Sequence, residues 1–189
     1  GKAQEGVVVE EGGDMEFAPD VEVRDGDIIE GDGWSVECVH TPGHTSNHIC
    51  FSWREGKALL SGDHVMGWST SIVSPPDGDM TAYLASLSKL LERDESVYWP
   101  THGPAIRNPK PFVQAFIDHR HAREAQILEC IEAGVTRIQD MVPRMYKDVS
   151  TKLYPAAARS VLAHLEHMVG DGRVACSQAP AVNTEFRLS

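Results

Sequence analysis

The chain has 189 residues, 41% of them hydrophobic, and a formal net charge of −11. It can therefore bury the core of one domain or of two small ones. The acidic balance argues against a protein that coats nucleic acid, and the sequence has no apolar run near 18 residues long that could span a membrane. The acidic excess belongs to residues 1–109, because residues 110–178 hold nine basic and eight acidic side chains.

The cysteines and the start of the chain indicate a cytoplasmic protein. No C-x-x-C pair is present, and each cysteine has apolar neighbours, which predicts buried free thiols in a reducing compartment: Cys38, Cys50, Cys130 and Cys176. The polar first residues predict no signal peptide. A chain that begins with Gly rather than Met suggests processing, a tag remnant or a fragment.

Short strands joined by Asp-Gly turns are predicted for the first forty residues. Val7–Val9 reads as an edge strand, and Val21–Val23 and Ile28–Ile29 flank a turn at residues 24–27. The aspartates of these turns lack the terminal Glu of a calcium-binding loop, so hairpin turns are the better interpretation.

Three predicted strands then end at Pro- or Gly-containing turns that carry a metal-ligating side chain. The strands are residues 36–40, 57–60 and 96–99, and the side chains are His44, Asp63 and His102. Because Pro fixes φ and Gly tolerates positive φ, such turns hold a side chain in place before a metal arrives. We therefore predict one site at one edge of a sheet.

Further candidates lie beside these three residues. His48 and His64 are one step outside the pattern, and each either contacts the ligands or substrate or is plain surface. The long loop over residues 65–80 is expected to wall the site, with these candidates: Trp68, Ser69, Thr70 and Asp79. Alternatively, Asp79 or Thr81 caps the amphipathic helix that is predicted to end near residues 93–94.

A change of period at Asn108-Pro109-Lys110-Pro111 predicts a domain boundary. Beyond it the pattern is helical over residues 112–133, 138–142 and 155–169, and residues 171–176 form a turn and a short strand. This order is typical of a winged helix. The predicted organisation is a first domain over 1–109, a winged-helix-like domain over 110–178 and a loosely held tail over 179–189.

Two groups of basic residues on these helices admit more than one interpretation. The first is either a solvated helix face or a contact for phosphate or a partner: His119, Arg120, His121 and Arg123. The second lies on the helix that a winged helix offers to DNA: Arg159, His164 and His167. The near-neutral charge of residues 110–178 argues against DNA binding, so we expect this module to pack on the first domain or on a second subunit.

The motifs T-P-G-H-T-S-N-H, L-L-S-G-D-H and W-P-T-H-G-P occur here in that order. They resemble the third, fourth and fifth motifs of the metallo-β-lactamase fold hydrolases, most of all the β-lactamase-like hydrolases with a C-terminal winged helix. The resemblance covers residues 17–176. It implies an α/β (α+β) fold, in which the second half of an αββα sandwich is followed by the helical domain.

The resemblance also implies a site and a chemistry. His44 would ligate a first zinc ion, His102 a second, and Asp63 would bridge them, with Asp63, His48 and His64 as catalytic candidates. Two zinc ions lower the pKa of a bridging water, and the resulting hydroxide attacks a carbonyl or phosphorus centre. Substrates implied by the family include thioesters, lactones, β-lactams and RNA phosphodiesters.

One family motif, H-x-H-x-D-H, is missing from this sequence, and with it four expected metal ligands. We therefore interpret the chain as the C-terminal part of a zinc hydrolase, inactive and weak in metal binding alone. The alternative is a non-catalytic assembly module with a vestigial half site. Half of a sandwich exposes its inner face, so either interpretation allows a homo-oligomer.

Overall fold

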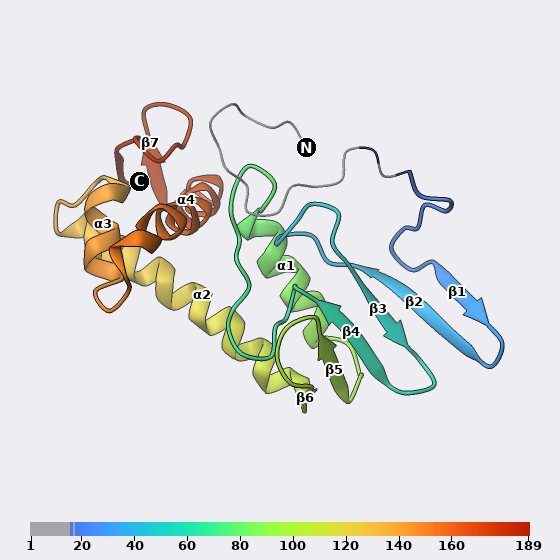
Figure 1. Cartoon of the computed structure of the whole chain (residues 1–189). Coiled ribbons are helices and arrows are strands. Elements are labelled where there is room, and N and C mark those ends of the chain that lie inside the picture. Colours follow the sequence, from blue (N-terminus) through green and yellow to red (C-terminus); the bar gives the residue numbers. More distant parts are fainter. Residues whose placement is uncertain (1–15, 17) are drawn as a thin grey trace.

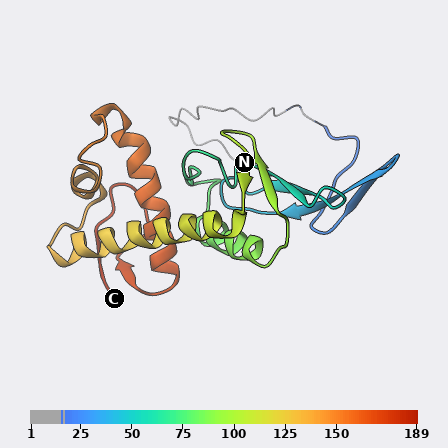
Figure 2. The same cartoon turned by 90° about the horizontal axis from the view of Figure 1, so that it is seen from below.

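The computed structural model describes residue 16 and residues 18–189, so the strand expected at Val7–Val9 lies outside the described residues. A six-stranded sheet with helix α1 (Met80–Leu91) makes up the first part of the molecule (Figure 1). Helices α3 (Ile138–Met145) and α4 (Tyr154–Gly170) make up most of the second. The long helix α2 (Pro109–Glu132) runs from one part to the other (Figure 2).

The strands of the large sheet follow one another in sequence order. They are β1 (Ile28–Gly31), β2 (Trp34–His40), β3 (Ile49–Trp53), β4 (Ala58–Gly62), β5 (Val97–Pro100) and β6 (Ile106–Arg107). Neighbours are antiparallel except β4 and β5, which are parallel because α1 carries the chain back between them. The strand expected at Val21–Val23 is absent: residues 21–24 have no ladder partner, and only the turn at 24–27 forms.

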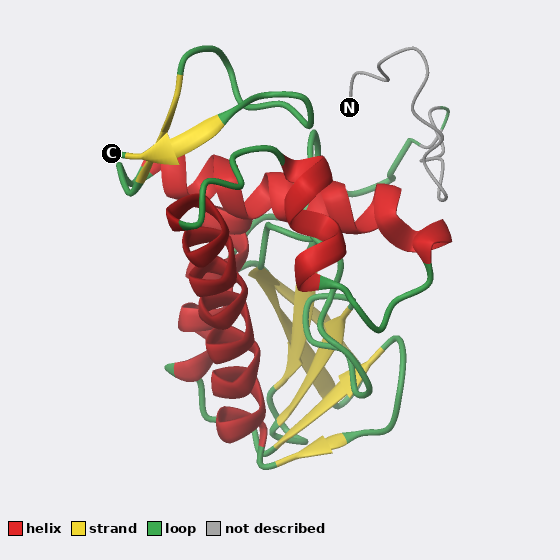
Figure 3. Ribbon diagram, turned by 90° about the vertical axis from the view of Figure 1, so that its left-hand side faces the viewer, coloured by secondary structure: helices red, strands yellow, loops and turns green. Residues whose placement is uncertain are grey.

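Helices cover one face of the sheet (Figure 3). Alternate strand residues point into the core that they form with α1 and the first half of α2, among them Val39, Leu59 and Tyr98. Asp79 caps α1 by accepting a hydrogen bond from the Ala82 amide at 2.8 Å. Of the two roles predicted for Asp79, the structure therefore shows the helix cap.

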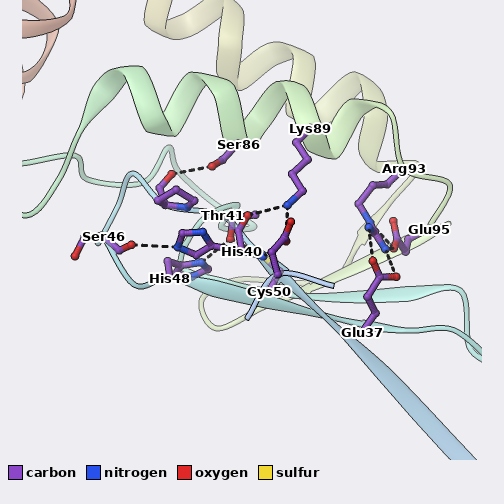
Figure 4. A network of polar contacts seen from close by, with 12 residues as sticks. Glu37, His40, Thr41, Ser46, His48, Cys50, Ser86, Lys89, Arg93 and Glu95 are labelled. Carbon is purple, nitrogen blue, oxygen red and sulfur yellow. Dashed lines mark hydrogen bonds and ion pairs between the residues drawn. The ribbon is translucent and has the colours of Figure 1, made fainter. Parts of the chain in front are cut away.

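Charged side chains fasten the far end of α1 to the strands (Figure 4). Arg93 lies between Glu37 of β2 and Glu95, with its Nη2 atom 3.2 Å and 2.7 Å from their carboxylate oxygens. Lys89 donates to the His40 carbonyl oxygen at 3.1 Å. These contacts hold the end of β2, from which the site loop begins, against the helix.

The C-terminal part has a core of its own, formed by the second half of α2 together with α3 and α4. The two prolines of the predicted boundary lie in the first turn of α2, where a missing N–H costs nothing. A short 3-10 helix, η1 (Thr151–Leu153), precedes α4. Strand β7 (Val174–Cys176) pairs with β8 (Phe186–Leu188).

Residues 179–189 are therefore not a loosely held tail, and that prediction is wrong. Thr184 and Phe186 are buried, and the Phe186 amide donates to the Thr136 carbonyl oxygen at 2.9 Å. The strand was missed because its pairing with β7 spans a Pro-containing loop that carries no local strand pattern.

The helical part packs on the sheet part through α4. Ala163 of α4 belongs to the first core, and Thr81 of α1 lies 2.9 Å from the His167 ring. Of the two alternatives expected for this module, the structure shows packing on the first domain, and packing on a second subunit stays a prediction. In the described part of the chain no helix is both long and apolar enough to cross a bilayer.

Candidate functional site

The three strand-end residues predicted as metal ligands lie along one edge of the sheet. Asp63 follows β4 and His102 follows β5, and because these strands are parallel their ends meet at the same edge. The His102 Nε2 atom lies 3.6 Å from Asp63 Oδ1. His44 lies in the loop that joins β2 to β3, with its ring centroid 6.4 Å from that of His48.

Asp63 has an unusual environment for a carboxylate. Its Oδ1 atom is buried and has no hydrogen-bond partner among the described residues. Such an oxygen only accepts, and buried acceptors in proteins are almost always satisfied. An orphaned acceptor that faces a histidine nitrogen marks a place for a proton or a cation.

His44 is held by a backbone carbonyl. Its Nδ1 atom lies 2.6 Å from the oxygen of Ile72, in the loop between β4 and α1. Because a carbonyl oxygen only accepts, Nδ1 carries the proton, and in the neutral ring Nε2 presents its lone pair. Metal-binding histidines are commonly oriented through the other ring nitrogen in this way.

His48 uses both ring nitrogens within the protein. Nδ1 lies 2.8 Å from the Thr41 hydroxyl, and Nε2 accepts the Asp63 backbone N–H at 3.2 Å. Figure 4 shows this ring between the strands and α1. Burial, and next the neighbouring His44, lower the pKa of His48 to about 4. His48 is therefore a neutral support that fixes the backbone of Asp63.

Gly62 makes this contact possible. Its φ is +55°, and a Cβ at this position would lie 2.6 Å from His48 Nε2. Glycine at position 62 is therefore needed twice, for the turn at the end of β4 and for the close approach of the His48 ring.

His64 lies behind His48, with ring centroids 5.7 Å apart, and beside Tyr83 at 4.7 Å. It is fully buried, and neither ring nitrogen has a partner among the described residues. Burial lowers the pKa of His64 well below its ordinary value. With no exposed surface, His64 does not face substrate in this structure, and its support of the ligands stays a prediction.

Trp68 is the clearest wall residue of the loop between β4 and α1. It is 72% exposed, and its ring stacks on that of His102 at 6.0 Å with an interplanar angle of 3°. The Gly67 amide donates to the His102 carbonyl oxygen at 2.8 Å, which joins the two loops. Ser69 is exposed and Thr70 half-buried, and their part in the wall stays a prediction.

Several supporting residues have no motif in the sequence. The Ser71 hydroxyl donates to the Asp63 and His64 carbonyl oxygens, and the Tyr83 hydroxyl donates to His64 at 2.9 Å. Arg120 of α2 is buried, donates to the Ser71 carbonyl oxygen and lies over the Tyr83 ring. The two alternatives predicted for its cluster are a solvated helix face and a contact for phosphate or a partner. Neither describes Arg120, which is 3% exposed and bonded within the chain.

The donors of the site fit zinc in kind but not in number. Imidazole and carboxylate are common zinc ligands, and a zinc ion takes three or four of them from the protein. Among the residues that the structure describes, no group of three or more His, Cys, Asp or Glu side chains is placed to hold a metal ion. His44, Asp63 and His102 are therefore at most part of a metal site.

Comparison with known proteins agrees with this fold and site. A family model described as the metallo-beta-lactamase superfamily matches residues 2–102, more than half of the chain. A second, described as the beta-lactamase associated winged helix domain, matches residues 138–179. The chain therefore belongs to the metallo-β-lactamase superfamily, a hydrolase-like family whose members generally bind metal ions, and it carries the associated winged helix.

Among its relatives is the "Beta-lactamase-like protein 2 homolog" of Drosophila melanogaster, 34% identical over 151 residues, which cover 78% of this chain and 50% of the relative. An "Atrochrysone carboxyl ACP thioesterase" of Aspergillus fumigatus is 35% identical over 110 residues, 58% of this chain and 34% of the relative. The chain thus spans about half the length, or less, of these curated relatives.

Solved structures show the same fold. A metallo-beta-lactamase family protein from Thermus thermophilus has a TM-score of 0.77 at 20% identity, covering 91% of this chain and 55% of that one. A beta-lactamase domain protein from Burkholderia ambifaria has a TM-score of 0.79 at 19% identity, covering 92% and 54%. The α/β class and the winged-helix prediction are confirmed.

Proposed function

We propose that this chain is the C-terminal part of a metal-dependent hydrolase and that His44, Asp63 and His102 are its contribution to the metal site. The observation that carries the proposal is the buried Oδ1 of Asp63, which has no hydrogen-bond partner among the described residues and lies 3.6 Å from His102 Nε2. The Nδ1-protonated ring of His44 supports it, because that form leaves Nε2 to bind a metal. The remaining ligands would come from residues outside this sequence, since the H-x-H-x-D-H motif is missing from it.

When bound, two zinc ions would supply a hydroxide at neutral pH. The residues of this chain would do the positioning. His48 holds the Asp63 backbone through Nε2, and Ser71 holds the Asp63 carbonyl oxygen. Trp68 would present an aromatic face to substrate at the mouth of the site.

Esters and thioesters are the substrate class that we propose, ahead of lactones and phosphodiesters. The relative that is named an acyl-carrier-protein thioesterase supports this choice. The net charge of −11 argues against a polyanionic substrate such as RNA. This chain alone is proposed to be inactive, because its described residues offer too few ligands for a zinc ion.

Zinc titration of the 189-residue chain against a chromophoric chelator tests the assignment. We expect an apparent Kd weaker than about 1 μM, equivalent to less than ~8 kcal/mol, whereas complete zinc sites reach roughly 10–16 kcal/mol. Asp63→Asn and His102→Gln should each weaken binding about tenfold or more. His121→Gln, which removes an exposed histidine of α2, is the matched control.

Unchanged zinc affinity in both site variants would show that these residues are not ligands. Tight binding of two zinc ions, with turnover of an S-acyl-N-acetylcysteamine thioester by this chain alone, would instead contradict the proposal that the site is incomplete.

A further inference from the structure

The loop between β4 and α1 accepts hydrogen bonds from two arginines of the helical part of the molecule. Arg120 of α2 donates to the Ser71 carbonyl oxygen. Arg159 of α4 donates through Nε to the Ser74 hydroxyl at 2.6 Å and through Nη2 to the Pro75 carbonyl oxygen. We call residues 71–75 the clamped segment.

The residue that orients His44 lies inside the clamped segment. The Ile72 carbonyl oxygen, which accepts from His44 Nδ1 at 2.6 Å, comes one residue after the Arg120 contact and two before the first Arg159 contact. The Ile72 side chain is 63% exposed, so side-chain packing contributes little to fixing this peptide. Its neighbour Val73 is fully buried and anchors the segment on its other side.

Arg159 belongs to the winged helix, since it lies within the residues matched by that family model. The planar guanidinium donates in two directions, to a side chain and to a backbone carbonyl of the same segment. A single ammonium group would not reproduce that geometry. The contact spans 84 and 85 residues of sequence, so no local pattern reveals it.

From these contacts we propose that Arg159 of the winged helix is a positioning residue for the candidate metal site. It holds the clamped segment so that the Ile72 carbonyl keeps His44 protonated at Nδ1 and leaves Nε2 free. The winged helix thereby takes part in the site rather than serving only as an attached module. The inference rests on the proposed function in one respect, that His44 is a metal ligand.

The tautomer of His44 is the direct test, because it can be read without metal or substrate. Two-bond proton–nitrogen spectra of the nitrogen-labelled chain report which ring nitrogen carries the proton, and His44→Gln identifies the signals. We expect wild-type His44 to be mainly the Nδ1–H form. Arg159→Gln should lower the ratio of Nδ1–H to Nε2–H by roughly two- to tenfold, the range that one net hydrogen bond supplies.

Two variants separate positioning from a general loss of structure. Arg137→Gln makes the same substitution in the C-terminal part, where the Arg137 side chain pairs with the exposed Glu185, and should leave the His44 signals unchanged. Arg159→Lys should give an intermediate ratio, because one donor nitrogen replaces the two that Arg159 uses. If Arg159→Gln fails to fold, Ser74→Ala removes one clamp contact without altering α4 and should shift the ratio in the same direction.

An unchanged His44 tautomer in folded Arg159→Gln and Ser74→Ala would overturn the inference. The zinc titration is independent of this result. If Asp63→Asn and His102→Gln both bind zinc like the wild type while the His44 tautomer responds to Arg159→Gln, the positioning role of Arg159 stands and the proposed function fails. If instead the site variants weaken zinc binding and the His44 tautomer does not respond to Arg159→Gln, the proposed function stands and the positioning role of Arg159 fails.

Discussion

Glu124 shows how a single residue joins the helices of the C-terminal part. Its side chain is 2% exposed, and its Oε2 atom accepts from Arg173 Nη1 at 2.8 Å. The ring nitrogens of His164 and His167 on α4 lie 3.5 Å and 3.7 Å from Oε1. Of the three residues considered for a DNA-facing surface, these two histidines therefore face Glu124 on α2.

A pH-dependent stability follows from Glu124. Burial by itself would raise the pKa of this carboxyl. Hydrogen bonds and charge from His164 and Arg173 outweigh burial and lower the pKa to about 2. The folded-state pKa is thus below the ordinary 4.5, so the contribution to stability is present above pH 4.5 and is lost as the pH falls toward 2. We expect Glu124→Gln to cost about 1–3 kcal/mol at pH 7, measured by urea unfolding, and to flatten the loss between pH 4.5 and 2.

Glu132→Gln is the matched control, because Glu132 is an exposed residue at the end of the same helix. It should leave both the stability at pH 7 and its pH dependence nearly unchanged. If Glu124→Gln behaves like this control, the carboxylate does not hold α2 to α4.

At the scale of elements, the sequence predicted what depends on local chemistry. The hairpin of β3 and β4 and the turns before His44, Asp63 and His102 could all be predicted from period and turn residues. The parallel pairing of β4 with β5 could not, because alternation alone carries no strand direction. The roles of Arg120 and Arg159 were missed because their partners are 49 or more residues away.

The pairing of β7 with β8 gives a prediction for the last element. Phe186 of β8 is 1% exposed and belongs to the second core, so Phe186→Ala should destabilise the chain by about 3–5 kcal/mol. Equilibrium unfolding in urea measures this loss. Leu188→Ala, two residues further on and 42% exposed, should change the free energy of unfolding by less than about 1 kcal/mol.

Equal effects of the two substitutions would mean that β8 does not close the second core. If both substitutions change the free energy of unfolding only slightly, residues 179–189 are a loosely held tail after all. The structure favours neither outcome, because the Phe186 amide is also bonded to Thr136.

At the scale of the whole molecule, the two faces of the large sheet differ. Helices cover one face, whereas the outward face carries a row of apolar side chains paired across three strands, Phe51 with Leu60 and Leu60 with Trp99. Leu60 and Trp99 are about half exposed, at 47% and 51%. An apolar row of this kind on a sheet face favours association with another surface.

We therefore expect the 189-residue chain to self-associate through this face. Light scattering coupled to size exclusion should give a mass that rises above the monomer value with concentration. Leu60→Lys should return the mass toward that of the monomer while leaving the melting temperature nearly unchanged, because the side chain already faces solvent. Leu153→Lys places the same charge on an exposed leucine of η1, 56% exposed and outside the sheet, and should not alter the mass. If the mass is that of a monomer at every concentration, or if both lysine substitutions change it equally, the apolar row is not an association surface. The prediction of a homo-oligomer would then have no support.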